Sequence, residues 1–276
     1  MRLLTLALLL VTAWASPGAD AKKEISWQHH FDDALTLAKA TGKPLLLDFR
    51  ADWCAPCKRM DREVWPDERV NAQADRYIFV SIDIDRESGV KNRYQVHAIP
   101  TVVVADPWGH AVQSYAGFIG SAQVLDMLGQ LPSDYGEVRE SYDILEHDAK
   151  NGKALYRIGQ FYADRHAFHL SSEFYGNALK SDFAKEDADF REDVTLGIAL
   201  NDFRDGNTNG ARKKLDAFLK TFPNGHRQAE ALLGQIAVAI RQRKLSLAGT
   251  IFEELQQRYP DSQATLNAKA MLAQAK

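Results

Sequence analysis

The sequence contains two cysteines, Cys54 and Cys57, separated only by Ala55 and Pro56. A C-x-x-C pair that follows a strand and opens a helix places its first thiol at the helix N-terminus, where free backbone N–H groups favour the thiolate. We therefore expect Cys54 to be a nucleophile and Cys57, one turn further on, to be a resolving thiol that attacks a mixed disulfide. The pair alone leaves two alternatives open, a purely structural disulfide and half of a metal site.

The residues around the cysteines predict a small mixed α/β sheet. Apolar runs predict strands over Pro44–Phe49, Tyr77–Ile84 and Thr101–Ala105, the first two of them buried. Helical spacing predicts helices over residues 31–41, 55–64, 90–96 and 121–131. The turn residues Asp106-Pro107-Trp108-Gly109 predict that His110–Tyr115 returns as an antiparallel strand.

After residue 132 the strand pattern stops and the chain reads as successive helices. Leu-Gly pairs at 196–197 and 233–234 are each followed by spaced small and aromatic residues and by a proline, Pro223 or Pro260. The 37-residue step between these prolines is close to the period of a helix-turn-helix repeat. This region resembles degenerate tetratricopeptide repeats, whose stacked helix pairs offer a surface to a partner protein. A generic helical bundle is the alternative.

Length, charge and cysteine content restrict the function further. The chain has 276 residues, of which 45% are hydrophobic and 26% charged, which fits a globular protein of two domains. We expect these domains to span residues 22–132 and 133–276. A net charge of −3 gives no electrostatic reason for binding nucleic acid or an anionic membrane. Two cysteines exclude a multi-disulfide scaffold and a four-cysteine zinc site.

The amino terminus predicts export. Arg2 precedes the apolar run Leu3–Val11, and A-x-A sequences follow at residues 13–15 and 19–21. This pattern is typical of a cleaved signal peptide over residues 1–15, with cleavage extending to residue 21 if the second site is used. An uncleaved anchor is the alternative, but the apolar run is short for a membrane span. We therefore expect a periplasmic or secreted protein without stable membrane insertion.

The motif DFRADWCAPCK at residues 48–58, followed by Ile99-Pro100-Thr101 at the start of a strand, resembles the thioredoxin superfamily. The resemblance covers about residues 25–131. Ile25-Ser26-Trp27, Met60 and Val64 make it most similar to the exported group that includes the C-terminal domain of the membrane disulfide reductase DsbD. It implies an α/β thioredoxin-like domain, a mixed central sheet flanked by helices, followed here by the all-α repeat domain.

The resemblance implies further site residues. Pro100 would be a cis-proline facing the disulfide, with Ile99 and Thr101 beside it on the segment that pairs with a bound substrate strand. Asp48 would be the buried acid that accepts the proton of Cys57.

Four more positions follow from the same resemblance. Trp53 and Pro56 would shape the docking surface, and Gly117 would lie beside the substrate groove. Lys58 would add positive charge near the thiolate, although a solvated helix lysine is an equal alternative.

Two departures from the family pattern bear on the activity. Arg50 stands where thioredoxins proper carry an aromatic residue. The intervening pair Ala55-Pro56 lacks the histidine that stabilises the thiolate in strong oxidants, which favours reduction.

These observations predict an exported thiol:disulfide oxidoreductase that reduces protein disulfides in the cell envelope. It would need a membrane electron donor similar to DsbD, and neither an organic cofactor nor a bound metal is expected. The alternative is a scaffold protein in which the helical repeats bind a partner and the thioredoxin-like domain serves as a docking or redox-sensing module.

Overall fold

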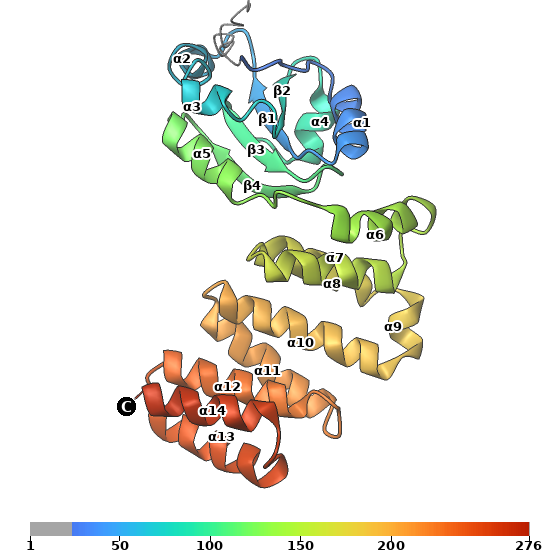
Figure 1. Ribbon diagram of the computed structural model, residues 1–276, viewed down its shortest axis with the longest axis vertical. Helices are drawn as coiled ribbons and strands as arrows, with labels where there is room; N and C mark the ends of the chain where they lie inside the picture. The colour runs from blue at the N-terminus through green and yellow to red at the C-terminus, as the bar shows by residue number, and fades with distance from the viewer. Residues whose placement is uncertain (1–23, 276) are drawn as a thin grey trace, which may run out of the picture.

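A computed structural model describes residues 24–275, so the predicted signal peptide lies outside the described residues. The first half of the described chain alternates helices and strands (Figure 1). Its elements are α1 (Phe31–Thr41), β1 (Leu45–Arg50), α2 (Ala55–Glu63), α3 (Glu68–Asn71), β2 (Ile78–Asp83), α4 (Ser88–Arg93), β3 (Thr101–Ala105), β4 (Ala111–Ala116) and α5 (Ser121–Gly129). The predicted strands and helices are confirmed, and the short helix α3 was not predicted.

The four strands form one sheet in the order β2-β1-β3-β4. β1 pairs in parallel with β2 and antiparallel with β3, and β4 returns antiparallel to β3 as predicted. Gln28 adds a parallel bridge to Val80 beyond β2. β1 lies inside the sheet, between β2 and β3. The residues that follow β1 therefore lie near the middle of the edge at which this strand ends.

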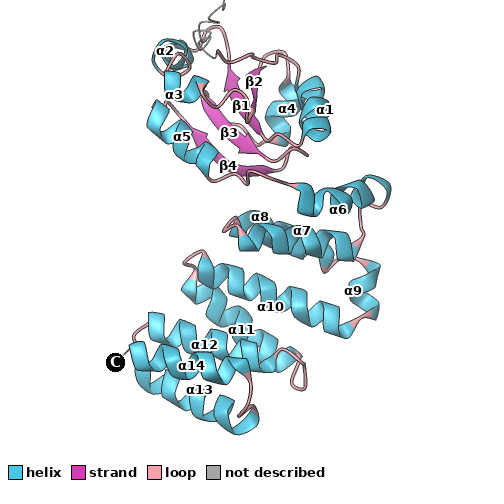
Figure 2. Cartoon of the chain, in the orientation of Figure 1, coloured by secondary structure: helices cyan, strands magenta, loops and turns pink. Residues whose placement is uncertain are grey.

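Helices cover both faces of this sheet (Figure 2). Side chains alternate along β1, so Leu45, Leu47 and Phe49 pack with residues of α1 on one face. Leu46 lies on the opposite face in a cluster with Met60 of α2 and residues of α3 and α5. Asp48 and Arg50 have the same parity as Leu46, which places them on the face that α2 covers.

The second half of the described chain is entirely helical. Its helices are α6 (Gly136–His147), α7 (Gly152–Asp164), α8 (Phe168–Ala178), α9 (Asp182–Glu186), α10 (Ala188–Arg204), α11 (Thr208–Thr221), α12 (Gln228–Arg241), α13 (Leu245–Arg258) and α14 (Gln263–Gln274). Antiparallel pairs stack one on the next, with α8 packed on α10 and α11 packed on α12 (Figure 1). This is the repeat arrangement that the spaced small and aromatic residues predicted.

The recurring glycines allow the helices to approach closely. A Cβ atom on Gly159 of α7 would lie 2.5 Å from the ring of Tyr175, and one on Gly197 of α10 would lie 2.7 Å from the same ring. Tyr175 of α8 is therefore held between α7 and α10, and it is 4% exposed. Steric exclusion around one aromatic ring explains why both helices carry glycine at these positions.

A buried polar network joins the two halves. Asp106, in the turn after β3, is fully buried and accepts hydrogen bonds from the hydroxyls of Tyr142 and Tyr162, at 2.7 and 2.5 Å. His110 Nδ1 lies 3.0 Å from Asp106 Oδ2. The indole of Trp108 stacks on Tyr142 with ring centroids 3.7 Å apart. The β3–β4 turn is thus part of the core of the first helices of the array.

Within residues 24–275, no helix combines the length and apolar character needed to cross a membrane.

Candidate functional site

Cys54 and Cys57 form a disulfide with a Cα–Cα distance of 5.3 Å. Cys54 is the N-cap of α2, and its sulfur accepts a hydrogen bond of 3.2 Å from the backbone N–H of Cys57. Pro56 in the first turn suits the start of a helix because its ring presets the backbone angle. The sulfur of Cys54 therefore lies at a helix N-terminus, where the backbone N–H groups stabilise a thiolate once the disulfide is reduced.

The Ile99–Pro100 peptide bond is cis, the geometry that the resemblance implies. Ile99 packs against the cluster formed by Ala51, Cys54 and Cys57. The loop that contains this bond therefore touches the disulfide itself.

Thr101 and Gly117 hold the loop that contains the cis-proline through hydrogen bonds. Thr101 is buried, and its hydroxyl donates a hydrogen bond of 2.7 Å to the carbonyl of Ala98. The N–H of Gly117 donates to the carbonyl of Pro100 at 2.7 Å. A Cβ atom on Gly117 would meet nothing within 4 Å, but its φ of +104° requires glycine. The side chain of Thr101 and the backbone of Gly117 therefore both hold this loop in place.

Trp53, Pro56 and Lys58 form the exposed surroundings of the disulfide. Trp53 is 67% exposed, which makes it the largest exposed hydrophobic side chain beside the cysteines. Its indole N–H donates a hydrogen bond of 2.8 Å to Asp85, so the ring is held in place although it is exposed. A fixed aromatic side chain of this kind suits a docking surface.

Asp48 lies in β1 on the face that α2 covers and is 2% exposed. Its Oδ1 atom has no hydrogen-bond partner among the described residues. Burial raises the pKa of this carboxyl to about 7, with Arg50 acting to lower the pKa and Asp61 to raise it. A carboxyl that titrates near neutral pH is suited to accept and return a proton.

Arg50 reaches from the end of β1 to α2, where both terminal guanidinium nitrogens donate to the Asp61 carboxylate, at 2.6 and 2.7 Å. The hydrogen bond to Asp61 raises the pKa of the guanidinium, so the arginine stays charged. Asp61 lies one turn after Cys57. The sequence marked Arg50 as a departure from the family pattern but did not identify this partner.

A second group of ionisable residues lies in the helical half. Atoms of Asp189, Glu192 and His226 that are able to bind a metal lie within 4.8 Å of one another. Glu192, however, accepts the backbone N–H groups of His226 and Arg227, at 3.1 and 2.8 Å. This carboxylate therefore closes the loop between α11 and α12, which is a structural role.

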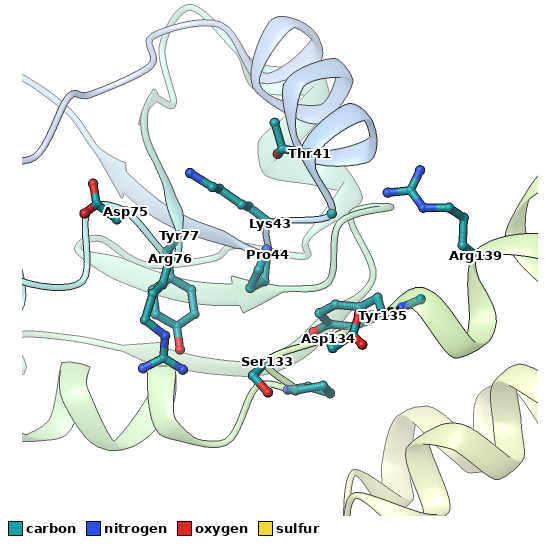
Figure 3. Close-up of a pocket in the computed structure, with 13 residues that line it drawn as sticks. Thr41, Lys43, Pro44, Asp75, Arg76, Tyr77, Ser133, Asp134, Tyr135 and Arg139 are labelled. Atoms are coloured by element: carbon teal, nitrogen blue, oxygen red, sulfur yellow. Dashed lines mark hydrogen bonds between the residues drawn. The ribbon is translucent and has the colours of Figure 1, made fainter.

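A pocket lies between the sheet and the first helix of the array (Figure 3). The residues before β1 and β2, among them Pro44 and Tyr77, line it together with Arg139 of α6. Its cationic side chains, Lys43, Arg76 and Arg139, point in different directions and do not converge on one point (Figure 3). The pocket lies where β1 begins, and therefore at the opposite end of that strand from the disulfide.

Comparison with known families agrees with this geometry. Residues 26–107 match a family model described as thioredoxin-like, and residues 230–262 match the tetratricopeptide repeat model. A thiol:disulfide interchange protein DsbD from Yersinia pestis is 30% identical over 149 residues, which is 48% of this chain and 25% of the relative. A DsbD protein from Pseudomonas aeruginosa is 35% identical over 92 residues, 30% of this chain and 16% of the relative. The matched region is thus about a quarter or less of each relative's length.

Solved thioredoxins are also similar to part of the chain. The germline-specific thioredoxin Deadhead of Drosophila melanogaster shares 25% identity over 39% of this chain and 100% of its own, with a TM-score of 0.34. Mitochondrial thioredoxin 3 of Saccharomyces cerevisiae shares 24% identity over 38% of this chain and 94% of its own, with a TM-score of 0.32.

Together, the C-x-x-C disulfide, the cis-proline loop and the family matches support thiol–disulfide chemistry in general. The chain therefore contains a thioredoxin-like domain similar to part of DsbD, followed by a helical region of the tetratricopeptide repeat type.

Proposed function

We propose that this protein is an exported thiol:disulfide oxidoreductase that reduces protein disulfides in the cell envelope. The observation that carries the proposal is the Cys54–Cys57 disulfide at the N-terminus of α2, in contact with Ile99 of the cis-proline loop. The signal peptide predicted over residues 1–15 supports export.

The reaction is a two-electron exchange. In the reduced protein the Cys54 thiolate attacks a substrate disulfide, forms a mixed disulfide and releases one substrate thiolate, which takes up a proton. Cys57 then loses its proton to Asp48 and attacks the sulfur of Cys54. The Cys54–Cys57 bond forms, the bond to the substrate breaks, and the second substrate sulfur leaves as a thiolate. The protein is left oxidised and the substrate reduced.

The residues around the disulfide bind the substrate. The backbone of Ile99 and Thr101, on either side of Pro100, pairs with an extended substrate segment. The exposed indole of Trp53 and the ring of Pro56 contact the same segment, and Gly117 holds the loop through its hydrogen bond to Pro100. Lys58, exposed on α2, adds positive charge near the Cys54 thiolate.

Repeated turnover requires a donor that returns electrons to the oxidised pair. We propose a membrane reductase similar to DsbD, because DsbD proteins are the relatives of this domain. The redox-active disulfide itself carries the electrons, so the proposal needs no organic cofactor or metal.

The helical repeats bind a protein partner in this proposal. α2 lies at the opposite end of the thioredoxin-like domain from the helical array (Figure 1). A partner held by the repeats therefore reaches the disulfide only if it extends along the sheet domain, or if it positions a second protein there.

The test is the equilibrium redox potential of the mature protein, measured by thiol trapping, together with its ability to reduce insulin. A potential at or below about −220 mV supports a reductase, and a value near −120 mV indicates an oxidant. The Cys57→Ser variant should retain envelope proteins as mixed disulfides through Cys54, and the matched Cys54→Ser variant should not. A pair that cannot be cycled supports the scaffold alternative.

A further inference from the structure

The ion pair between Arg50 and Asp61 lies beside the proposed proton acceptor. Arg50 is two residues after Asp48 in β1, so both side chains extend from the same face of the sheet. The side chains of Arg50 and Asp61 are 23% and 35% exposed, whereas Asp48 is 2% exposed. A partly buried, bidentate pair keeps its geometry better than an ordinary surface ion pair.

We propose that Arg50, clamped by Asp61, is a positioning residue that sets the charge of the Asp48 carboxyl and thereby the rate at which Cys57 resolves a mixed disulfide. The inference rests on the proposed function, because Asp48 takes the Cys57 proton only in that reaction. It assigns a role to Arg50, one of the two departures from the family pattern near the cysteines.

The charges around Asp48 support this role. Desolvation favours the neutral carboxyl, and the negative charge of Asp61 acts in the same direction. The positive charge of Arg50 acts in the opposite direction. Asp52 also interacts with Arg50, and the indole of Trp65 lies beside Asp48. The ion pair therefore places two opposed charges near Asp48, and both act on its ionisation together with the larger effect of burial.

Opposite substitutions should shift this balance in opposite directions. Arg50→Met removes the cation and leaves the Asp61 charge unpaired, so Asp48 should remain protonated to higher pH. Asp61→Asn leaves Arg50 unpaired beside Asp48, so Asp48 should ionise at lower pH. A purely structural ion pair would give the same direction of effect in both variants.

The reaction of the reduced protein with dithiobis(nitrobenzoate), a symmetrical aromatic disulfide, separates the two chemical steps. Attack by Cys54 releases one coloured thiolate and forms a mixed disulfide, and attack by Cys57 releases the second. The pH dependence of the second phase reports the resolving step. The rate of the second phase should rise with pH as Asp48 ionises, and this rise is the acid limb of the profile. Arg50→Met should move the acid limb up by about one pH unit, so the second phase should be about tenfold slower at pH values on the limb. Asp61→Asn should move the limb down.

Three controls complete the experiment. Arg50→Lys keeps the cation and should shift the limb less than Arg50→Met. Arg59→Met breaks the exposed ion pair with Glu63 on the same helix and should leave the profile unchanged. Asp48→Asn should remove the limb. If Arg50→Met does not fold, Asp61→Asn and Arg50→Lys still carry the test.

The outcomes separate this inference from the proposed function. Equal profiles, or shifts in the same direction, for Arg50→Met and Asp61→Asn would overturn the inference while wild-type insulin reduction still supported the function. If the wild-type protein reduces no insulin and shows no second phase, the proposed function itself fails.

Discussion

The hydroxyl of Tyr142 donates a 2.7 Å hydrogen bond to the Asp106 carboxylate and so joins α6 to the turn between β3 and β4. The neighbouring Tyr135 is buried to a similar extent and also packs on Trp108, but its hydroxyl has no hydrogen-bond partner among the described residues. These two tyrosines distinguish the contribution of the hydrogen bond from that of the aromatic ring.

Tyr142→Phe should therefore lower the free energy of unfolding by about 1.5–3 kcal/mol, because it removes a hydrogen bond to a buried charge. Tyr135→Phe should be neutral or slightly stabilising, because it removes a polar group without a partner. Urea unfolding measures both. If Tyr142→Phe loses no more stability than Tyr135→Phe, the hydrogen bond to Asp106 does not stabilise the junction of the two halves.

The same network makes the junction sensitive to pH. Burial opposes protonation of His110, but the Asp106 charge and hydrogen bond outweigh it and raise the pKa of the imidazole. Burial likewise opposes ionisation of Asp106, but His110 and the hydrogen bonds lower its pKa. Glu173 of α8 favours protonation of His110, and Arg93 of α4 opposes it.

The His110 contribution is present below its ordinary pKa of 6.5 and is lost as the pH rises through the raised value. The Asp106 contribution is present above 3.8 and is lost as the pH falls through the lowered value. The junction should be most stable between about pH 4 and 6.5. The free energy of unfolding of the wild type, measured in urea, should therefore decline at alkaline pH. His110→Gln should lose this alkaline decline, whereas His169→Gln, which changes an exposed residue of α8, should retain it. An unchanged alkaline decline in His110→Gln would contradict the assignment.

Asp48 should lower the stability of the oxidised protein at neutral pH. Because burial raises its pKa from 3.8 to about 7, the unfolded chain ionises first as the pH rises, and stability falls between these values. Asp48→Asn should match the wild type at pH 4 and be more stable at pH 8, by at most roughly 4 kcal/mol. Thermal unfolding at the two pH values measures the difference. A variant less stable than the wild type at pH 8 would show that the carboxylate has a stabilising partner.

Local patterns in the sequence were sufficient for the sheet and the helical array. Apolar runs and turn residues are short-range signals, so β1, β2, β3 and the β4 return lie where they were predicted. The helix α3 has only four residues, too few to show a helical period. Its place is fixed instead by Asn71, which donates to the carbonyl of Trp65 and accepts the backbone N–H of Ile25.

The site was predicted in its motif residues but not in the contacts between distant residues. The C-x-x-C spacing predicts Cys54 as the nucleophile, and the family resemblance implies Asp48 and Pro100. The Arg50–Asp61 and Trp53–Asp85 pairs were not anticipated. The second of these pairs joins residues 32 apart in the sequence, and the Asp106–Tyr162 bond spans 56. Charge and hydrogen-bonding capacity are visible in a sequence, but the partner depends on which elements pack together.

The close helix packing around Tyr175 offers a test of the repeat array. Gly159→Ala places a methyl group 2.5 Å from the current ring position, and the ring is also confined by Gly197 on its other side. Relief therefore requires α7 and α8 to separate, at a cost of about 1–3 kcal/mol.

Gly176→Ala, in α8 itself, introduces a methyl group that meets nothing within 4 Å. It should be neutral or stabilise the helix by up to about 1 kcal/mol, because alanine favours the helix over glycine. Thermal unfolding and limited proteolysis of the two variants compare their stabilities. Equal destabilisation would mean that both glycines serve the helix backbone, and a loss confined to Gly159→Ala would locate the constraint at the ring of Tyr175.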